Sequence, residues 1–262
     1  MSRPADVPFD SPAVERGAGF FETVLLVGRR AVLWTQHLDR LETTVGRWQL
    51  PAPSRSALES ETVRLVVEAG LAPTEERALR LAWIAVGSEL ERSESWRLDI
   101  SLRPVPPLTL VRREGCHGVT LPPALQRDTP STKSTSYFAA VAGLRIAVRA
   151  GGTEGLFTAP DGSYLEGTST ALVAWNGGLP VRSRSGALPS VTAAAFAPEP
   201  GPGLSLSEPL LRDGAALCGS LTLAAPLVSI DGKPCARPPA MLERIADFNR
   251  RLRADPSLGR EL

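Results

Sequence analysis

Lysine is almost absent from this 262-residue chain, because only Lys133 and Lys233 among its 29 basic side chains are lysines and the others are arginines. Histidine occurs twice, and the three cysteines show no metal-binding or redox spacing. Two histidines argue against a histidine-based metal site and against a Ser-His-Asp triad, and we expect no metal. Reduced thiols are the simplest interpretation of the cysteines, and they predict a cytoplasmic protein.

Long apolar runs are also missing. No stretch approaches the roughly 20 residues that a membrane span needs, and the first residues lack the apolar core of a signal peptide. The formal net charge is +1, with arginines and acids interspersed. This balance favours neither nucleic acid nor an anionic membrane as a partner.

The two lysines stand in different local sequences. Lys233 lies in Asp-Gly-Lys-Pro, which is typical of an exposed turn, whereas Lys133 lies in a polar loop, Pro130 to Tyr137, that leads into an apolar-periodic segment. An ammonium can lose its proton and become a nucleophile, but a guanidinium in practice cannot. We therefore predict that Lys133 is kept for imine chemistry. The alternative is that coding drift removed the other lysines by chance. The rarity of lysine does not by itself decide between these two explanations.

Hydrophobic periodicity predicts mixed strands and helices without strict βαβ alternation, and hence an α+β or α/β fold. Predicted strands cover 22–27, 31–35, 77–86, 96–103, 108–113, 118–121, 154–158, 163–165, 171–175, 215–218 and 227–230. Predicted helices cover 36–49, 56–69, 136–150, a short stretch after 190, and 239–253. Prolines at 104, 106 and 107 mark a break, which predicts two domains, 1–107 and 108–262.

Six short motifs follow one another along the chain. They are Arg-Gly-Ala-Gly-Phe-Phe-Glu-Thr at 16–23, His-Leu-Asp-Arg-Leu at 37–41, the Lys133 loop, Asp-Gly-Ser-Tyr-Leu-Glu-Gly-Thr-Ser-Thr at 161–170, Leu-Pro-Ser-Val-Thr at 188–192 and Cys-Gly-Ser-Leu-Thr at 218–222. Each is weak alone. Together, in this order and spacing, they resemble the class IV (fold type IV) pyridoxal-phosphate enzymes, the group of branched-chain and D-amino-acid aminotransferases and aminodeoxychorismate lyases.

The resemblance covers about residues 16–234 and implies an architecture. It implies an N-terminal α/β sandwich and a larger C-terminal pseudo-barrel, with pyridoxal phosphate between them. It also implies a homodimer that acts on small amino-acid and keto-acid substrates.

The resemblance further implies roles for single residues. Lys133 would form the Schiff base with the cofactor and then move a proton during the reaction. Glu166 would place a carboxylate against the ring nitrogen, and Arg40 would form a bidentate pair with the phosphate. The alternatives are an ordinary acid beside a turn for Glu166 and a solvated helix arginine for Arg40.

Other assignments are smaller contributions to the same cofactor site. Val191 and Thr192 match a loop whose backbone amides hold the phosphate, and Ser220 matches a hydroxyl residue with that task. Tyr137 matches a tyrosine that hydrogen-bonds the cofactor's phenolic oxygen, with a core tyrosine as the alternative. Ser169 and Thr170 are further candidates, although such residues are common at turns.

The chain departs from the family pattern around the substrate. The tyrosine that often precedes the Phe-Glu-Thr motif is missing, and Ala171 and Ala193 replace a usual asparagine and arginine. An arginine common at the end of a central strand is replaced by Ala85-Val86-Gly87. Arg92, Arg97 and His117 are candidates for the missing charge, with a solvated surface position as the favoured interpretation of each.

Three functions are compatible with this pattern. We favour an aminotransferase that moves an amino group between an amino acid and a 2-keto acid. The alternative is an aminodeoxychorismate lyase, because Cys218-Gly219-Ser220-Leu221 resembles a segment of those enzymes. A third hypothesis, a non-catalytic binding protein on the same fold, would require loss of the lysine or its carboxylate partner, and both are present.

Overall fold

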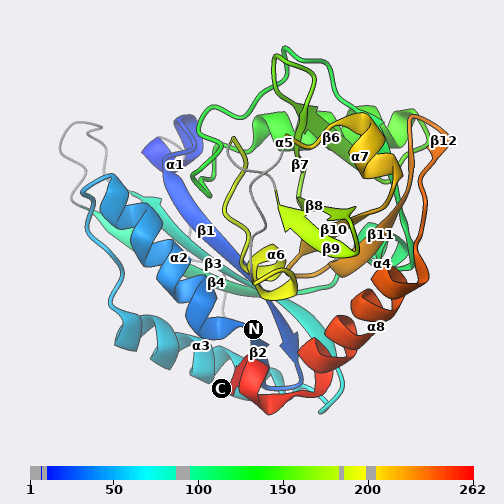
Figure 1. Ribbon diagram of the computed structural model, residues 1–262. Coiled ribbons are helices and arrows are strands. Elements are labelled where there is room, and N and C mark those ends of the chain that lie inside the picture. The colour runs from blue at the N-terminus through cyan, green and yellow to red at the C-terminus, as the bar shows by residue number, and fades with distance from the viewer. Residues whose placement is uncertain (1–6, 8–10, 87–94, 183–185, 199–204) are drawn as a thin grey trace. The chain divides into compact units, whose positions relative to one another are not determined.

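The computed structural model describes residues 7, 11–86, 95–182, 186–198 and 205–262. The chain forms two compact units. Figure 1 shows the chain with a colour that follows the residue number from blue to red. Unit 1 comprises Met1–Val105, Thr132–Tyr137 and Asp255–Leu262, and unit 2 comprises Pro106–Ser131 and Phe138–Ala254. The division into domains 1–107 and 108–262 stays a prediction. The units differ from it because two later segments of the chain group with unit 1.

Unit 1 is built on an antiparallel sheet in the order β13-β2-β1-β3-β4. Its elements are α1 Pro12–Glu15, β1 Gly19–Val27, β2 Arg30–Val32, α2 Trp34–Arg47, α3 Arg55–Ala69, β3 Glu76–Ala85, β4 Trp96–Pro104, the 3-10 turn Pro256–Leu258 and β13 Gly259–Glu261. The predicted hairpin at Gly28 is confirmed, because Val27 pairs with Arg30 and Gly28 adopts a positive φ of 58°.

Helices α2 and α3 cover one face of this sheet (Figure 1). Helix α2 buries residues three or four apart, which is the spacing of one helical face. They are Trp34, His37, Leu38, Leu41, Thr44 and Val45. The apolar members pack against Phe20, Val24 and Leu26 of β1 and Leu79 and Leu81 of β3.

Unit 2 contains an eight-stranded sheet that closes on itself. Its elements are α4 Pro107–Glu114, β5 Cys116–Thr120, α5 Phe138–Arg149, β6 Glu154–Thr158, β7 Tyr164–Gly167, β8 Ala171–Asn176, β9 Leu179–Arg182, α6 Val191–Phe196, α7 Glu208–Arg212, β10 Ala215–Gly219, β11 Leu223–Ile230, β12 Lys233–Pro234 and α8 Pro239–Ala254. Strand order runs β10-β11-β5-β6-β7-β8-β9, and β10 also pairs with β8. This second pairing closes the ring, so the predicted pseudo-barrel is confirmed.

The predicted strand at 108–113 is wrong, because these residues lie in helix α4. Pro107 occupies the first turn of the helix, where a missing N–H costs nothing. Thr109 and Arg112, three residues apart, are buried, whereas Leu110 and Val111 are exposed. Burial therefore follows the helical period, although the run of β-favouring residues suggested a strand.

Several short elements carry too little sequence signal for prediction, namely α7, β9, β12 and β13. Each has two to five residues, shorter than the windows in which periodicity is readable. Among the described residues, no helix is long and apolar enough to cross a membrane.

Candidate active site

Lys133 is held against the edge of β1 by its own backbone. Its carbonyl oxygen accepts a hydrogen bond from the amide of Phe21 at 3.1 Å, and the amide of Thr135 donates to the carbonyl of Gly19 at 2.8 Å. The loop Thr132–Tyr137 therefore runs alongside the first residues of β1. This pairing fixes the origin of the Lys133 side chain relative to the sheet of unit 1.

Two glycines of the motif at 16–23 make room for this loop. Gly17 has a φ of +65°, and a β-carbon there would lie 3.1 Å from the Cα of Ser136. A β-carbon at Gly19 would lie 2.9 Å from the side-chain oxygen of Thr135. Any side chain would push the lysine loop outward, so the Gly-Ala-Gly sequence has a steric cause.

The Lys133 ammonium lies over an aromatic ring. Its Nζ is 4.4 Å from the centroid of Phe21, and Tyr137 packs edge-on against the same ring at 5.3 Å between centroids. Lys133 is partly buried, whereas Lys233 is exposed in the turn where the sequence predicts it. The contact with the ring and the partial burial hold the Lys133 amine in a defined position beside β1.

Arg40 belongs to a buried charged cluster. Its Nε donates to Glu22 Oε1 at 2.8 Å, while its Nη2 contacts Oε2. His37 Nδ1 lies 2.7 Å from the same Oε2, and Glu22 and His37 are each 1% exposed. Burial opposes ionisation of Glu22, but the Arg40 charge and the hydrogen bonds from His37 and Arg40 outweigh it and lower its pKa to about 2.

The pKa of His37 is lowered, which favours its neutral form. Burial lowers its pKa, and the neighbouring Glu22 offsets this only in part, while Arg40 and Lys133 oppose a further positive charge. Glu22 therefore forms a charged pair with Arg40 and orients a neutral imidazole.

Glu166 is a buried carboxylate in unit 2 that contacts Arg127 and the backbone of Leu188. Its Oε1 lies 3.2 Å from Nε of Arg127, and its Oε2 accepts a hydrogen bond from the amide of Leu188 at 3.3 Å. Arg127 also donates through Nη2 to the carbonyl of Thr168 at 3.0 Å. Sequence reasoning missed Arg127, and its only signal was a position six residues before Lys133.

Ser169 and Thr170 direct their hydroxyl groups toward Glu154. Ser169 Oγ and Thr170 Oγ1 both donate to Glu154 Oε2 at 3.1 Å, and the amide of Thr168 donates to Oε1 at 3.0 Å. The carboxylate is fully buried and lies 3.4 Å from Nη1 of Arg112. A hydroxyl has one proton to donate. The predicted contacts of Ser169 and Thr170 with a phosphate stay predictions, and each would require an exchange of partner.

The remaining candidates lie around the loops that follow the barrel strands. Ser190 accepts a hydrogen bond from the amide of Ala193 and caps the six-residue helix α6, whose first residues Val191 and Thr192 are buried. Ser220 is partly buried directly after β10. Helix α6 is too short to provide a strong dipole, so the case for Val191 and Thr192 depends on their backbone amides and on the motif.

The candidates for a replacement substrate charge belong to different units of the chain. His117 Nδ1 lies 2.9 Å from Ser229 Oγ in unit 2, and Arg97 lies in β4 of unit 1. Arg92 lies outside the described residues. Within the described part of the chain, no cluster of histidine, cysteine and acidic side chains could hold a metal ion.

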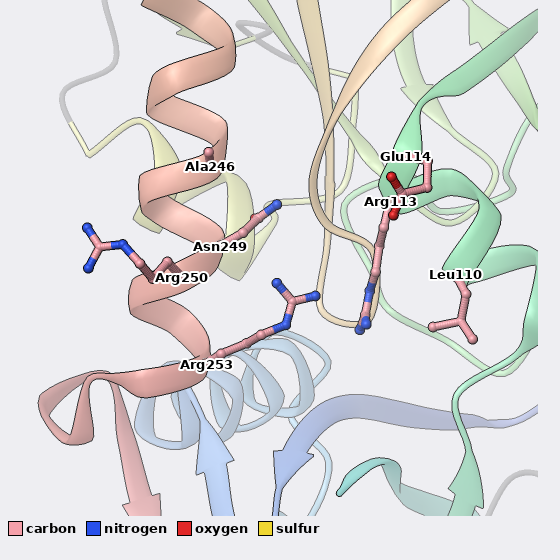
Figure 2. A pocket seen from close by; sticks show the side chains of 7 residues that line it. All are labelled: Leu110, Arg113, Glu114, Ala246, Asn249, Arg250 and Arg253. Atoms are coloured by element: carbon pink, nitrogen blue, oxygen red, sulfur yellow. The ribbon is translucent and has the colours of Figure 1, made fainter. Parts of the chain in front are cut away.

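A cavity of about 430 Å³ lies in unit 2, between the end of α4 and the C-terminal half of α8. Figure 2 shows the side chains that line it. It is lined by Leu110, Arg113, Glu114, Ala246, Asn249, Arg250 and Arg253. None of the candidate residues lies there. Arg113 donates twice to the Leu221 carbonyl, and Asn249 exchanges two hydrogen bonds with the backbone of Ala224. These side chains stabilise the packing of the two helices on β11.

The sequence matches the protein-family model described as amino-transferase class IV over residues 19–230. The chain belongs to the class IV aminotransferases. It is thus a pyridoxal-phosphate-dependent enzyme, as members of this family are. The match begins at β1 and ends with β11, so it includes the Lys133 loop and the closed sheet of unit 2.

This class IV aminotransferase is similar to several known proteins and solved structures. A bifunctional aminodeoxychorismate lyase / D-amino acid transaminase of Mycobacterium tuberculosis is 34% identical over 182 residues, which are 64% of this chain and 61% of that protein. A hypothetical aminotransferase from Mycobacterium tuberculosis has a TM-score of 0.83 in its pyridoxal-phosphate-bound form, at 26% identity over 97% of this chain and 95% of that chain.

A second structure of that name holds α-ketoglutarate and pyridoxamine phosphate and has a TM-score of 0.82 at 28% identity, covering 96% of this chain and 94% of that chain. A branched-chain aminotransferase from Thermoproteus uzoniensis has a TM-score of 0.81, covering 95% of this chain and 90% of that chain. Its 19% identity shows a shared fold alone.

Proposed function

We propose that this protein is a transaminase that moves an amino group between an amino acid and a 2-keto acid, with Lys133 as the residue that binds the cofactor covalently. The observation that carries the proposal is the position of Lys133. Its backbone is paired with β1, and its ammonium lies 4.4 Å from the Phe21 ring centroid. The other lysine is exposed in a turn and has no comparable setting.

Two residues of unit 1 would bind the phosphate and the phenolic oxygen of the cofactor. Arg40 is oriented by its ion pair with the buried Glu22, and a guanidinium with an oriented plane is suited to a phosphate. Tyr137 is fixed by its contact with Phe21, four residues after Lys133, and its hydroxyl would hydrogen-bond the phenolic oxygen. Once the substrate amine has displaced it, Lys133 would carry the proton to and from the substrate Cα.

Residues of unit 2 fit the ring and the phosphate. When bound, pyridoxal phosphate supplies the electron sink that stabilises negative charge on the substrate. Glu166 would place its carboxylate against the ring nitrogen, and Arg127, whose Nε lies 3.2 Å from Oε1, would hold that carboxylate in position. The backbone of Val191 and Thr192 and the hydroxyl of Ser220 would bind the phosphate, with Ser169 and Thr170 as further candidates.

The lyase is the second candidate, and one observation favours it. The bifunctional relative is named for both activities, and its likeness to this chain is the basis for considering both here. The transaminase is preferred because a relative that is similar over nearly its whole length binds α-ketoglutarate and pyridoxamine phosphate. Aminodeoxychorismate alone should yield pyruvate only with a lyase, whereas D- or L-alanine with 2-oxoglutarate should yield it only with a transaminase.

Two further properties belong to the proposal. The enzyme would be a homodimer whose partner subunit borders the substrate. It would be cytoplasmic, which is supported by three cysteines that are all buried and unpaired.

Lys133→Ala tests the proposal directly, with Lys233→Ala as the matched control. Borohydride treatment of the holoenzyme should add the mass of reduced cofactor to the wild type and to Lys233→Ala, on the peptide that contains Lys133. Lys133→Ala should acquire no covalent label and should lose transamination by at least about 1,000-fold, because no other amine can replace it. A label on Lys233, or full activity in Lys133→Ala, would contradict the proposal.

A further inference from the structure

Glu154 is the first residue of β6, and it is fully buried beside the turn that joins β7 to β8. Its carboxylate accepts hydrogen bonds from three successive residues of this turn, namely from the amide and hydroxyl of Thr168 and from the hydroxyls of Ser169 and Thr170. A carboxylate has about four lone-pair sites for hydrogen bonds. One turn therefore uses most of the acceptor capacity of Glu154, and residues 168–170 are held at several points.

Arg112 contacts the same turn from helix α4, and it is 4% exposed. Its Nη1 donates to Ser169 Oγ at 2.8 Å and lies 3.4 Å from Glu154 Oε2, and its Nε donates to the carbonyl of Thr153 at 2.7 Å. Its Nη2 is buried and makes no hydrogen bond within the described part of the chain. A buried ion pair often adds little net stability, and an unsatisfied N–H group lowers it. The geometry that this pair imposes explains it better than stability does.

Glu166 lies near the end of β7, next to this turn. It is paired with Phe157 of β6 and with Ala171 of β8. The amide of Gly167 donates to the carbonyl of Thr170 at 2.8 Å and closes the turn. Strands β7 and β8 are therefore joined by a short closed turn, and the path of this turn decides where the Glu166 carboxylate points.

Glu154 and Glu166 lie on opposite faces of the sheet. Opposed residues in an antiparallel pair share a face, and successive residues of a strand alternate between faces. Glu166 opposes Phe157 and shares its face. Gly167 opposes Leu156 and shares the other face, to which Glu154 also points, two residues before Leu156. A β-carbon at Gly167 would lie 3.0 Å from Cγ and Cδ of Glu154, so Glu154 packs against the backbone that carries Glu166.

We propose that Glu154, together with Arg112, is a positioning residue for Glu166. The pair holds the turn 168–170 and so keeps the Glu166 carboxylate in the place that a contact with the cofactor's ring nitrogen requires. This inference rests on the proposed function and extends it to two residues that act through another side chain. Arg127 contacts the Glu166 carboxylate itself, whereas Glu154 and Arg112 act on the backbone beside it.

Glu154→Gln is an isosteric test of this role. Its amide nitrogen would replace either Oε1, where it would face the amide of Thr168, or Oε2, where it would face Nη1 of Arg112. Neither of these groups can become an acceptor. Either orientation therefore sets two donors against each other and should displace the turn without a change in side-chain size. Glu208→Gln is the matched control, because it changes a partly exposed carboxylate of unit 2 that is paired with Arg212.

A double-mutant cycle separates action through Glu166 from a general loss of structure. With the preferred alanine enantiomer and 2-oxoglutarate, kcat should fall by about 1,000-fold in Glu166→Gln and by about 30-fold in Glu154→Gln. The double variant should lie within about threefold of Glu166→Gln, because the position of residue 166 no longer matters once its charge is gone. Glu208→Gln should stay within about twofold of the wild type. Losses that multiply to about 30,000-fold would overturn the inference.

Nitrogen NMR provides a readout that needs no turnover. In holoenzyme loaded with pyridoxal phosphate that is isotope-labelled at its ring nitrogen, the chemical shift reports the protonation and hydrogen bonding of that nitrogen. The wild type and Glu208→Gln should share one shift. Glu154→Gln should move part of the way toward the shift of Glu166→Gln. An unchanged shift in Glu154→Gln would overturn the inference.

A second variant serves if Glu154→Gln does not fold. Arg112→Lys keeps the charge but lacks the fork that reaches both Thr153 and Ser169, so its shift should move in the same direction. A folded Arg112→Lys with the wild-type shift would overturn the inference. Any of these contrary results would leave the borohydride labelling of Lys133 intact. Failure of that labelling in the wild type would instead overturn the proposed function.

Discussion

At the scale of single residues, Glu22 organises the buried charges of unit 1. It accepts hydrogen bonds from both His37 and Arg40, and it is the group whose pKa falls to about 2 despite complete burial. Removing its charge would leave Arg40 without its partner in a buried setting, which is costly. The Phe-Glu-Thr motif therefore has a structural reason besides any contact with a cofactor.

Glu22→Gln should change how stability depends on pH. The folded-state pKa of Glu22 lies below its ordinary value of 4.5, so its stabilisation is complete above about pH 4.5 and is lost as the pH falls toward 2. The lowered pKa of His37 acts in the same direction, because the unfolded state binds a proton there more readily. In urea unfolding, the wild type should lose about 3 kcal/mol through Glu22 between pH 5 and 2.

The variant should start less stable at pH 7 and show a shallower loss in that range. Glu42→Gln, which changes an exposed carboxylate paired with Arg55, should keep the wild-type slope. Parallel curves for Glu22→Gln and the wild type would show that Glu22 does not carry this charge in the folded state.

Sequence patterns were informative at this scale only for residues in motifs. The rarity of lysine and its polar loop indicated Lys133, and the His-x-x-Arg pattern indicated Arg40. Glu154 carried no such signal. Its importance depends on contacts with the turn at 168–170, which follows a different strand. Such contacts follow from strand register, which single-sequence periodicity does not specify.

At the scale of elements, the approach of the Lys133 loop to β1 depends on glycine. Gly17 combines a positive φ with a β-carbon position 3.1 Å from backbone atoms of the loop. The loop cannot retain its hydrogen bonds with Gly19 and Phe21 if it moves away. The short motif before the Phe-Glu-Thr sequence is therefore part of what positions the lysine.

Gly17→Ala should lower the free energy of unfolding by about 1–2 kcal/mol, because it combines backbone strain with a steric clash. It should also slow the borohydride-trapped labelling of Lys133. Gly46→Ala is the matched control, since Gly46 lies in α2 and a β-carbon there meets no atom within 4 Å. This control should raise stability by up to about 1 kcal/mol. A harmless Gly17→Ala would mean that the loop tolerates a different path.

Long periodic elements were predictable and long-range closure was not. Helix α2, predicted at 36–49, occurs at Trp34–Arg47, because its apolar spacing and its burial agree. The pairing of β10 with β8 joins residues more than forty positions apart, and no local sequence pattern predicts it. The barrel was therefore accessible only through family resemblance. Helix α4 shows the opposite failure, where composition favoured a strand and burial follows a helix.

At the scale of the whole molecule, the three cysteines are distributed through the core of unit 2. Burial raises the pKa of Cys116 to about 12, and it raises the pKa values of Cys218 and Cys235 as well. A thiol that ionises so reluctantly is a poor nucleophile. These residues act as small apolar side chains in the barrel.

Native protein should therefore react very slowly with a disulfide reagent such as dithionitrobenzoate at pH 8, and three thiols should appear after unfolding in guanidinium chloride. The rate of the native reaction should follow the population of opened molecules, because access requires local or global unfolding. Fast stoichiometric labelling of the folded enzyme, at a rate like that of free cysteine, would show that at least one thiol is accessible.

The pairing of residues 259–262 with unit 1 has a consequence for biosynthesis. Strand β13 pairs with β2, the backbone of Leu262 hydrogen-bonds that of Arg29, and the Arg29 side chain returns to the Leu262 carbonyl. A nascent chain that emerges from the ribosome in order can thus close the barrel of unit 2 from its own contiguous segments early. In the sheet of unit 1, one side of β2 stays unpaired until residues 259–262 have emerged from the exit tunnel.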